Sequence, residues 1–132
     1  MPAAEDGDVT ERHIGKPTVE MAVEGHLVLV LPPGGVVSGT MAAAAAEEVE
    51  LLAGDRKVPM LLVLTGVEAL SRRARAIFGG TRSLEAVAVL GVSPVDRVIA
   101  NFLLGGVSQP CPTRYFSAHD DAVAWLQKMH VA

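Results

Sequence analysis

Hydrophobic and polar side chains repeat along this chain with two different spacings, which predict an ordered series of strands and helices. Residues 18–23 alternate apolar and polar side chains, and residues 26–31 resume an apolar run after Glu24 and Gly25. A period of two residues interrupted by a short turn predicts an antiparallel hairpin. Residues 58–64 are apolar at almost every position, which is typical of a central strand covered by helices on both faces.

Two shorter apolar runs, residues 85–90 and 113–116, complete the predicted set of strands. Pro59 lacks a backbone N–H, so we expect it at the first turn or at the edge of its strand. Segments with helical spacing follow the strands from residue 38 onward. The expected fold is therefore α/β, with a mixed sheet of about five strands flanked by four helices.

Each of the four predicted helices has a start signal and an apolar face. A serine or threonine side chain can accept a hydrogen bond from a free N–H in the first turn. The expected caps are Ser38 or Thr40, Ser71, Ser93 and Ser117. The first helix is expected to bury Met41, Ala45, Val49 and Leu52, and the third to bury Val98, Ile99, Phe102 and Leu103.

The third helix is apolar over more of its surface than one core contact requires. Val95 and Leu104 extend its apolar stripe sideways. We therefore predict that these two residues lie on an association face.

Composition limits the classes of partner. The chain has 132 residues, a formal net charge of −4 and 4% aromatic residues. Phosphate backbones select basic surfaces, and single strands stack on aromatic rings, so nucleic acid is not an expected partner. Residues 1–15 lack periodicity and bury too little apolar surface to offset their ordering entropy. We expect a flexible tail there and one domain over residues 16–132.

Several kinds of site lack their sequence signatures. Cys111 is the single cysteine, which excludes an intrachain disulfide and fits a reducing cytoplasm. No apolar run approaches the roughly 20 residues that span a bilayer, so membrane insertion is not expected. The histidines lack metal-ligand spacing, the glycine pairs lack nucleotide-binding spacing, and the Gly-x-Ser-x-Gly elbow is absent. We therefore predict no metal, no cofactor and no enzymatic activity.

The candidate chemistry is concentrated at the second and third helices. Ser71 is a helix cap or a phosphorylation site, and we favour the cap. Arg72, Arg73 and Arg75 follow it, where they form either an anion site or a solvated charged face. Arg97 and Asn101 can line a pocket at the same sheet edge, or a surface ion-pair network can explain them.

The order of elements, with Leu64-Thr65-Gly66-Val67 before Ser71, resembles the anti-sigma-factor-antagonist fold, the STAS domain. The bacterial SpoIIAA-like branch is the nearer likeness, through the Arg-Ala-Arg helix after Ser71, the Ser93-Pro94 helix and the closing 112–116 strand. The resemblance covers roughly residues 18–128. It implies a small regulatory or interaction module, because members of the superfamily bind partner proteins or small ligands.

The resemblance also implies a switch, since well-characterised members are phosphorylated on a serine that follows an aspartate at a helix start. Alignment through Gly66 and Val67 puts Ser71 at the aspartate position and Arg72 at the phosphoacceptor position. We expect that this chain has lost the switch. The alternative is that Ser71 replaces the phosphoacceptor one residue early.

Three functional hypotheses follow. The leading one is a non-enzymatic regulatory or protein-interaction module that acts through the loop after Leu64 and the helices at Ser71 and Ser93. The second is a carrier of an apolar or anionic small molecule, which an enclosed pocket beside Arg97, Phe102 and Leu103 would favour. The third is a structural homodimer joined through the Leu104 side of its helix, which a flat apolar patch would favour.

Overall fold

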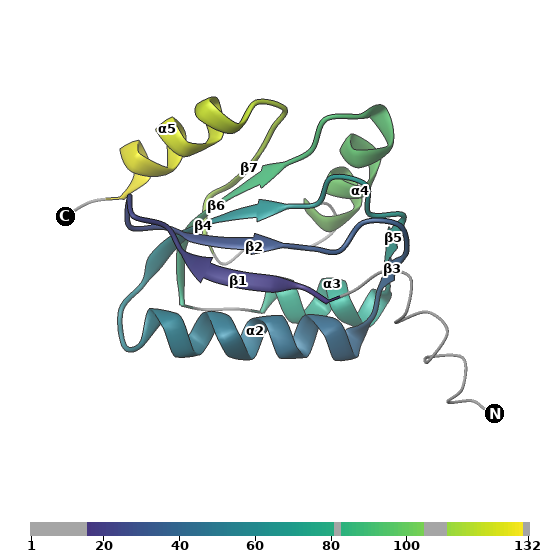
Figure 1. Ribbon diagram of the computed structural model, residues 1–132, viewed down its shortest axis with the longest axis horizontal. Coiled ribbons are helices and arrows are strands. Elements are labelled where there is room, and N and C mark those ends of the chain that lie inside the picture. Colours follow the sequence, from purple (N-terminus) through teal and green to yellow (C-terminus); the bar gives the residue numbers. More distant parts are fainter. Residues whose placement is uncertain (1–15, 81–82, 105–110, 131–132) are drawn as a thin grey trace.

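The computed structural model describes residues 16–80, 83–104 and 111–130, and of residues 102–104 it describes the backbone alone. The predicted N-terminal tail, residues 1–15, lies outside this part of the chain. A five-stranded sheet with the order β1-β2-β4-β6-β7 forms the centre (Figure 1). Its strands are β1 (Thr18–Met21), β2 (Leu27–Val30), β4 (Val58–Val63), β6 (Leu84–Leu90) and β7 (Thr113–Phe116). The predicted mixed α/β sheet is confirmed.

Strand directions divide the sheet into two parts. β1 is antiparallel to β2, as the hairpin prediction required, whereas β2, β4, β6 and β7 run parallel to one another. β4 therefore lies in the middle of the sheet, where its apolar sequence is buried on both faces. Pro59 lies at an irregularity in the pairing of β4 with β6, near the start of the strand, where its missing N–H costs little.

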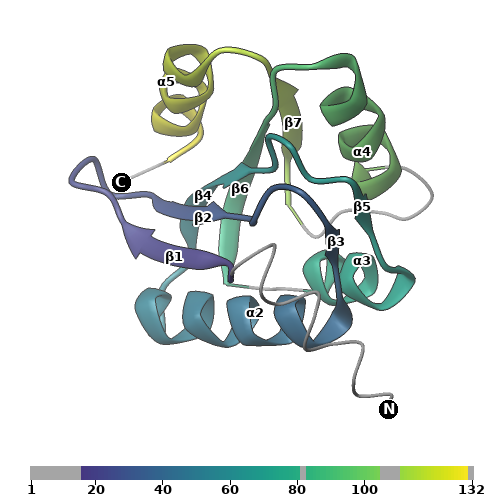
Figure 2. The same cartoon turned by 45° about the vertical axis from the view of Figure 1, so that its right-hand side comes forward.

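In the part of the chain that the structure describes, four helices cover the two faces of the sheet unequally. They are α2 (Gly39–Ala53), α3 (Arg72–Gly79), α4 (Pro94–Leu104) and α5 (His119–Met129). Side chains of α2, α3 and α4 belong to one hydrophobic cluster with one face of the sheet, and α5 packs on the other face (Figure 2). Within the described residues, no helix is long and apolar enough to span a bilayer.

The α2 helix buries smaller side chains than the pattern predicted. Its buried face consists of Gly39, Ala42, Ala45, Val49 and Ala53. Leu52 was expected inward, but the residue is 39% exposed. Small inward residues allow the helix backbone to lie close to the sheet, so the larger leucines at its end point outward.

A second, two-stranded parallel sheet was not predicted. It pairs β3 (Val36–Val37) with β5 (Ala69–Leu70), and the Ser71 N–H donates to the Val37 carbonyl at 3.0 Å. Each strand leads directly into a helix, β3 into α2 and β5 into α3. The pair consequently brings the starts of these two helices side by side (Figure 2).

Three of the four predicted helix caps are confirmed. The hydroxyls of Ser38, Ser71 and Ser93 accept hydrogen bonds from the N–H groups of Met41, Ala74 and Asp96 at 3.2, 3.0 and 3.0 Å. The prediction for Ser117 was wrong. α5 begins one residue later, with Ala118 at the capping position and no side-chain cap. Asp120 and Asp121 instead place negative charge in the first turn, which favours that end of the helix dipole.

Candidate functional site

The parallel strands end at one edge of the sheet, which we call the carboxyl edge. Residues 31–35, 64–68 and 91–93 form its loops after β2, β4 and β6. The Gly34 N–H donates to the Gly66 carbonyl at 2.8 Å, and the Gly91 N–H donates to the Phe116 carbonyl at 3.1 Å. In α/β sheets, binding sites form at such edges because the loops converge there. The described start of α4 and the approach to α3 both lie at this edge.

A buried carboxylate joins two of these loops. Asp96 is only 1% exposed. Its Oδ1 accepts from the Gly66 N–H at 3.0 Å, and its Oδ2 accepts from the N–H groups of Val92 and Ser93 at 2.8 and 3.1 Å. Asp96 therefore fixes the start of α4 to the loop after β4.

The charge of Asp96 is stabilised by these donors. Burial by itself would raise the pKa of the carboxyl. The N–H groups of Val92, Gly66 and Ser93, with the Ser93 hydroxyl, overcome that effect and lower the pKa below its ordinary value of 3.8. Asp96 is therefore ionised at neutral pH, and its hydrogen bonds to the loops are charge-assisted.

Two glycines make this arrangement possible. Gly66 has a φ of 81°, and a Cβ at that position would lie 2.8 Å from the Pro33 Cβ. A Cβ on Gly91 would lie 2.6 Å from the Asp96 Cβ and 3.0 Å from the Tyr115 hydroxyl. Any side chain at residue 91 would displace either the buried carboxylate or the tyrosine beside it.

The predicted Ser71 site lies at the start of α3. The Ser71 hydroxyl accepts a hydrogen bond from the Ala74 N–H, so the preferred interpretation as a cap is confirmed. Arg72 and Arg73 are exposed, and Arg75 is half-buried. Arg73 crosses the start of α2, where a Cβ on Gly39 would lie 2.5 Å from its Cδ. Arg73 thus lies beside the starts of both α2 and α3.

Arg97 and Asn101 lie on the exposed surface of α4. The Arg97 guanidinium carbon lies 5.1 Å from the centre of the Tyr115 ring, which is within the range of a cation–π contact. α4 also contacts β5, the strand that leads into Ser71. The α3 and α4 candidates therefore belong to the same edge of the fold.

An apolar ridge covers the outer side of the α4 start. Val92, Val95 and Val98 are 66, 59 and 64% exposed. Val95 and Val98 lie about one turn apart on α4, and Val92 lies two residues before the helix begins. We call these three residues the valine ridge. The prediction that Val98 is buried was wrong, because the inward positions of α4 are Asp96, Ile99 and Ala100. Val95 is exposed as the association face requires, whereas the Leu104 side chain lies outside the described residues.

Sequence reasoning missed the role of Asp96. The sequence pattern did not predict its contact with Gly66. The sequence did contain a sign of the local part of this role. Ser93 and Asp96, three residues apart and directly after an apolar strand, have the spacing of a capping box, in which each side chain accepts from the other's backbone N–H. The contact with Gly66, 30 positions away, has no counterpart in local spacing.

The sheet order and helix placement define a SpoIIAA-like α/β protein. A solved structure with that fold, an uncharacterised protein of the DUF3478 family from Shewanella loihica PV-4, is similar to this chain with a TM-score of 0.57 and 18% identity. The match covers 83% of this chain and 91% of the other. The predicted SpoIIAA-like fold is confirmed.

The family is shown by sequence. The chain belongs to the family described as "Domain of unknown function (DUF7793)", whose model matches residues 21–130. A protein of unknown function from Arthrobacter sp. FB24 is 39% identical over 83% of this chain and 97% of its own, with a TM-score of 0.32. No curated protein matches the sequence.

Proposed function

We propose that this protein is a non-enzymatic regulatory or protein-interaction module that binds a partner protein through the carboxyl edge. The valine ridge is the observation that carries the proposal. Three adjacent valines with more than half of each side chain in water form an apolar surface beside the α4 start. Surfaces of this kind are typical of interaction sites.

The size of the apolar contribution is modest. Full burial of one valine contributes about 1.5–3 kcal/mol, so burying the exposed parts of three would contribute on the order of 3–5 kcal/mol before the costs of association. A stable complex therefore needs further contacts. Arg72, Arg73 and Arg97 are exposed at the same edge and are suited to paired hydrogen bonds with carboxylates of a partner.

Regulation by phosphorylation is not part of the proposal. The resemblance places Arg72 at the phosphoacceptor position, and the neighbouring Ser71 hydroxyl already accepts a hydrogen bond as a cap. The single cysteine keeps the cytoplasm as the expected compartment.

The test compares two exposed apolar surfaces of the same protein. Val95→Asp with Val98→Asp places two charges on the valine ridge, and Leu51→Asp places one charge on α2, where the leucine is 74% exposed. Partners crosslinked in the native cells are identified and quantified by mass spectrometry. We expect a specific partner to be lost with the double variant and kept with Leu51→Asp. Retention with both variants, or loss with both, contradicts binding through the ridge.

A homodimer remains the second candidate, because an exposed ridge on a helix can also pair with its own copy across a two-fold axis. Native mass spectrometry of the protein from its own cells distinguishes the two, since it reports oligomer mass and bound molecules together.

The small-molecule carrier remains a third hypothesis. Its predicted pocket beside Phe102 and Leu103 depends on side chains outside the described residues.

A further inference from the structure

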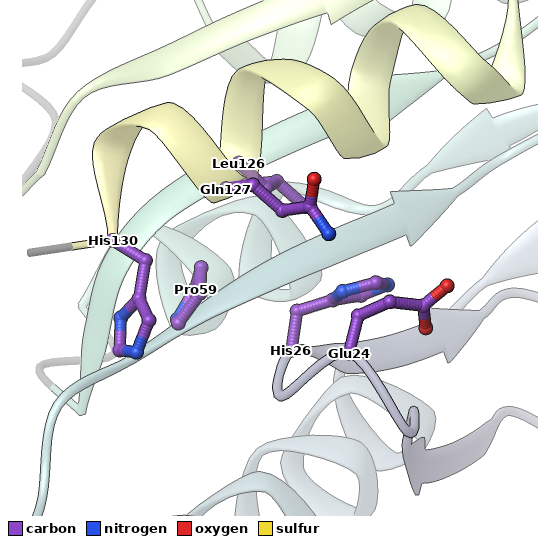
Figure 3. A pocket seen from close by; sticks show the side chains of 6 residues that line it. All are labelled: Glu24, His26, Pro59, Leu126, Gln127 and His130. Carbon is purple, nitrogen blue, oxygen red and sulfur yellow. The ribbon is translucent and has the colours of Figure 1, made fainter. Parts of the chain in front are cut away.

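A hollow of about 80 Å³ lies at the opposite end of the sheet, where β2 and β4 begin and α5 ends. Its lining comes from the β1–β2 turn, the start of β4, and the last turn of α5 with the residue that follows it (Figure 3). The lining residues are Glu24, His26, Pro59, Leu126, Gln127 and His130. None of them belongs to the carboxyl edge, so the hollow is independent of the proposed function.

His26 is the unusual residue of this hollow. It is only 3% exposed, and within the described part of the chain its imidazole has no protein hydrogen-bond partner. Buried polar side chains are nearly always hydrogen-bonded, so an imidazole that lines a hollow without a partner indicates a ligand. Burial lowers the pKa of His26 below 6.5 despite the opposing attraction of Glu24, and the nearby His119 lowers it further. The ring is thus neutral at pH 7 and offers an acceptor nitrogen.

The charged groups around the hollow determine whether it favours a cationic or an anionic ligand. The Glu24 carboxylate lies beside the His26 ring in Figure 3. The other carboxylate nearby, Glu85, already accepts from the His130 Nδ1 at 2.6 Å. The carbonyl end of the α5 dipole adds partial negative charge, which the exposed Lys128 of the last turn offsets in part. An anion would therefore be repelled by Glu24, whereas a cation would be attracted.

The volume of the hollow and the residues that line it further limit the kind of ligand it can hold. A single water occupies about 30 Å³ of liquid, so the hollow accommodates a head group of a few non-hydrogen atoms. Pro59 and Leu126 contribute apolar surface, which suits the methylene groups next to a charged head. Within the described residues, no three histidine, cysteine or acidic side chains are grouped to hold a metal ion.

We propose that this hollow binds a small organic cation, the guanidinium or ammonium head of a basic side chain or of a free amine. Glu24 supplies the counter-charge. His26 accepts a hydrogen bond from the head, and Pro59 and Leu126 contact its alkyl stem.

The experiment is a titration of the ¹⁵N-labelled full-length protein, followed by NMR at pH 7. Methylguanidinium chloride and an acetylated, amidated Ala-Arg-Ala peptide are the cationic probes. Methylurea and the matching citrulline peptide have nearly the same shape without the charge. We expect saturable shifts at His26, Gln127 and His130 with the cations, with dissociation constants on the order of millimolar. Equal shifts with the neutral probes, or none with the cations, would overturn the proposal.

Two exposed glutamates provide matched variants. Glu24→Gln should weaken cation binding about fivefold to tenfold, which is the range expected for one nearby opposite charge. Glu48→Gln on α2 makes the same change of charge elsewhere and should leave binding unchanged. Unaltered binding by Glu24→Gln would contradict the assignment. Tighter binding of the peptide than of methylguanidinium identifies a basic side chain of a protein as the natural occupant, and equal binding identifies a free small cation.

Discussion

Replacing Asp96 with asparagine should lower the free energy of unfolding by about 2–3 kcal/mol at pH 7. The carboxylate accepts three backbone N–H bonds of 2.8–3.1 Å, and asparagine has only one acceptor oxygen. Its NH₂ group would face at least one of those N–H donors. A hydrogen bond to a charged group contributes about 1.5–3 kcal/mol, so losing one and weakening the others gives this range. Alanine, which removes every acceptor, should cost about 4 kcal/mol.

Urea denaturation measures this loss directly. With a slope of about 1.5 kcal/mol per molar, the asparagine variant should unfold at a urea concentration about 1.3–2 M lower. Asp121→Asn is the control, because Asp121 is an exposed acid in the first turn of α5. It makes the same change of charge without buried donors and should cost less than about 0.5 kcal/mol.

The pH dependence tests the electrostatic part of the reasoning. Because the folded pKa of Asp96 is lower than its ordinary value of 3.8, the ionised carboxylate contributes its full stability above pH 3.8. That contribution is lost as the pH falls through the folded pKa. The difference between the wild type and Asp96→Asn should therefore narrow at the acid end. A difference below 0.5 kcal/mol at pH 7, or one that is constant down to the acid end, would refute the argument.

Three further predictions concern association, anion binding and pH. If the protein is a dimer joined through α4, Leu104→Asp should give a folded monomer, and an unchanged hydrodynamic mass would rule this out. Arg72→Ala with Arg75→Ala should abolish any thermal stabilisation by phosphate-bearing ligands, and a retained shift would exclude anion binding at α3. Burial lowers the pKa of His26 below 6.5, so stability is full above pH 6.5 and declines as the pH falls from there toward the folded pKa. His26→Gln should flatten that decline, and an unchanged profile would show that His26 is not its cause.

Much of the fold could be predicted because its signals are local. Ser71 and Ser93 were identified as caps from residue type and position, and both accept the expected hydrogen bonds. The apolar sequence of β4 correctly predicted a central strand. The prediction for Ser117 failed because serine is a preferred capping residue, and the sequence alone does not show that the capping position of α5 is one residue later, at Ala118.

The pair of β3 and β5 illustrates a limit of local patterns. Each strand has two residues, too few for any alternation to be recognised. Their pairing joins Val36 and Val37 to Ala69 and Leu70, more than 30 positions away in the sequence. The adjacent starts of α2 and α3 depend on this pairing, so the contact of Arg73 with the start of α2 could not be predicted from spacing.

The hollow around His26 was missed for a different reason. The histidines were evaluated only as metal ligands, from their spacing along single helices. His26 directly precedes β2 and His130 directly follows α5, and both residues line the same hollow. Only the packing of α5 on the sheet creates that proximity. A lone polar residue before an apolar strand gives no sign in the sequence that it will be buried.

Asp96 explains why the orientation of α4 was predicted wrongly. A charged residue is ordinarily assigned to the solvent side of a helix, which turns Val98 toward the core. Here the carboxylate points inward because the backbone N–H groups of Gly66, Val92 and Ser93 donate the hydrogen bonds that a buried, ionised carboxylate requires. With Asp96 inward, residues one turn later, Ile99 and Ala100, are buried, and the valine ridge must face outward. The buried acid that joins two loops of the carboxyl edge thus also fixes the rotation of α4 that exposes the ridge proposed to bind a partner.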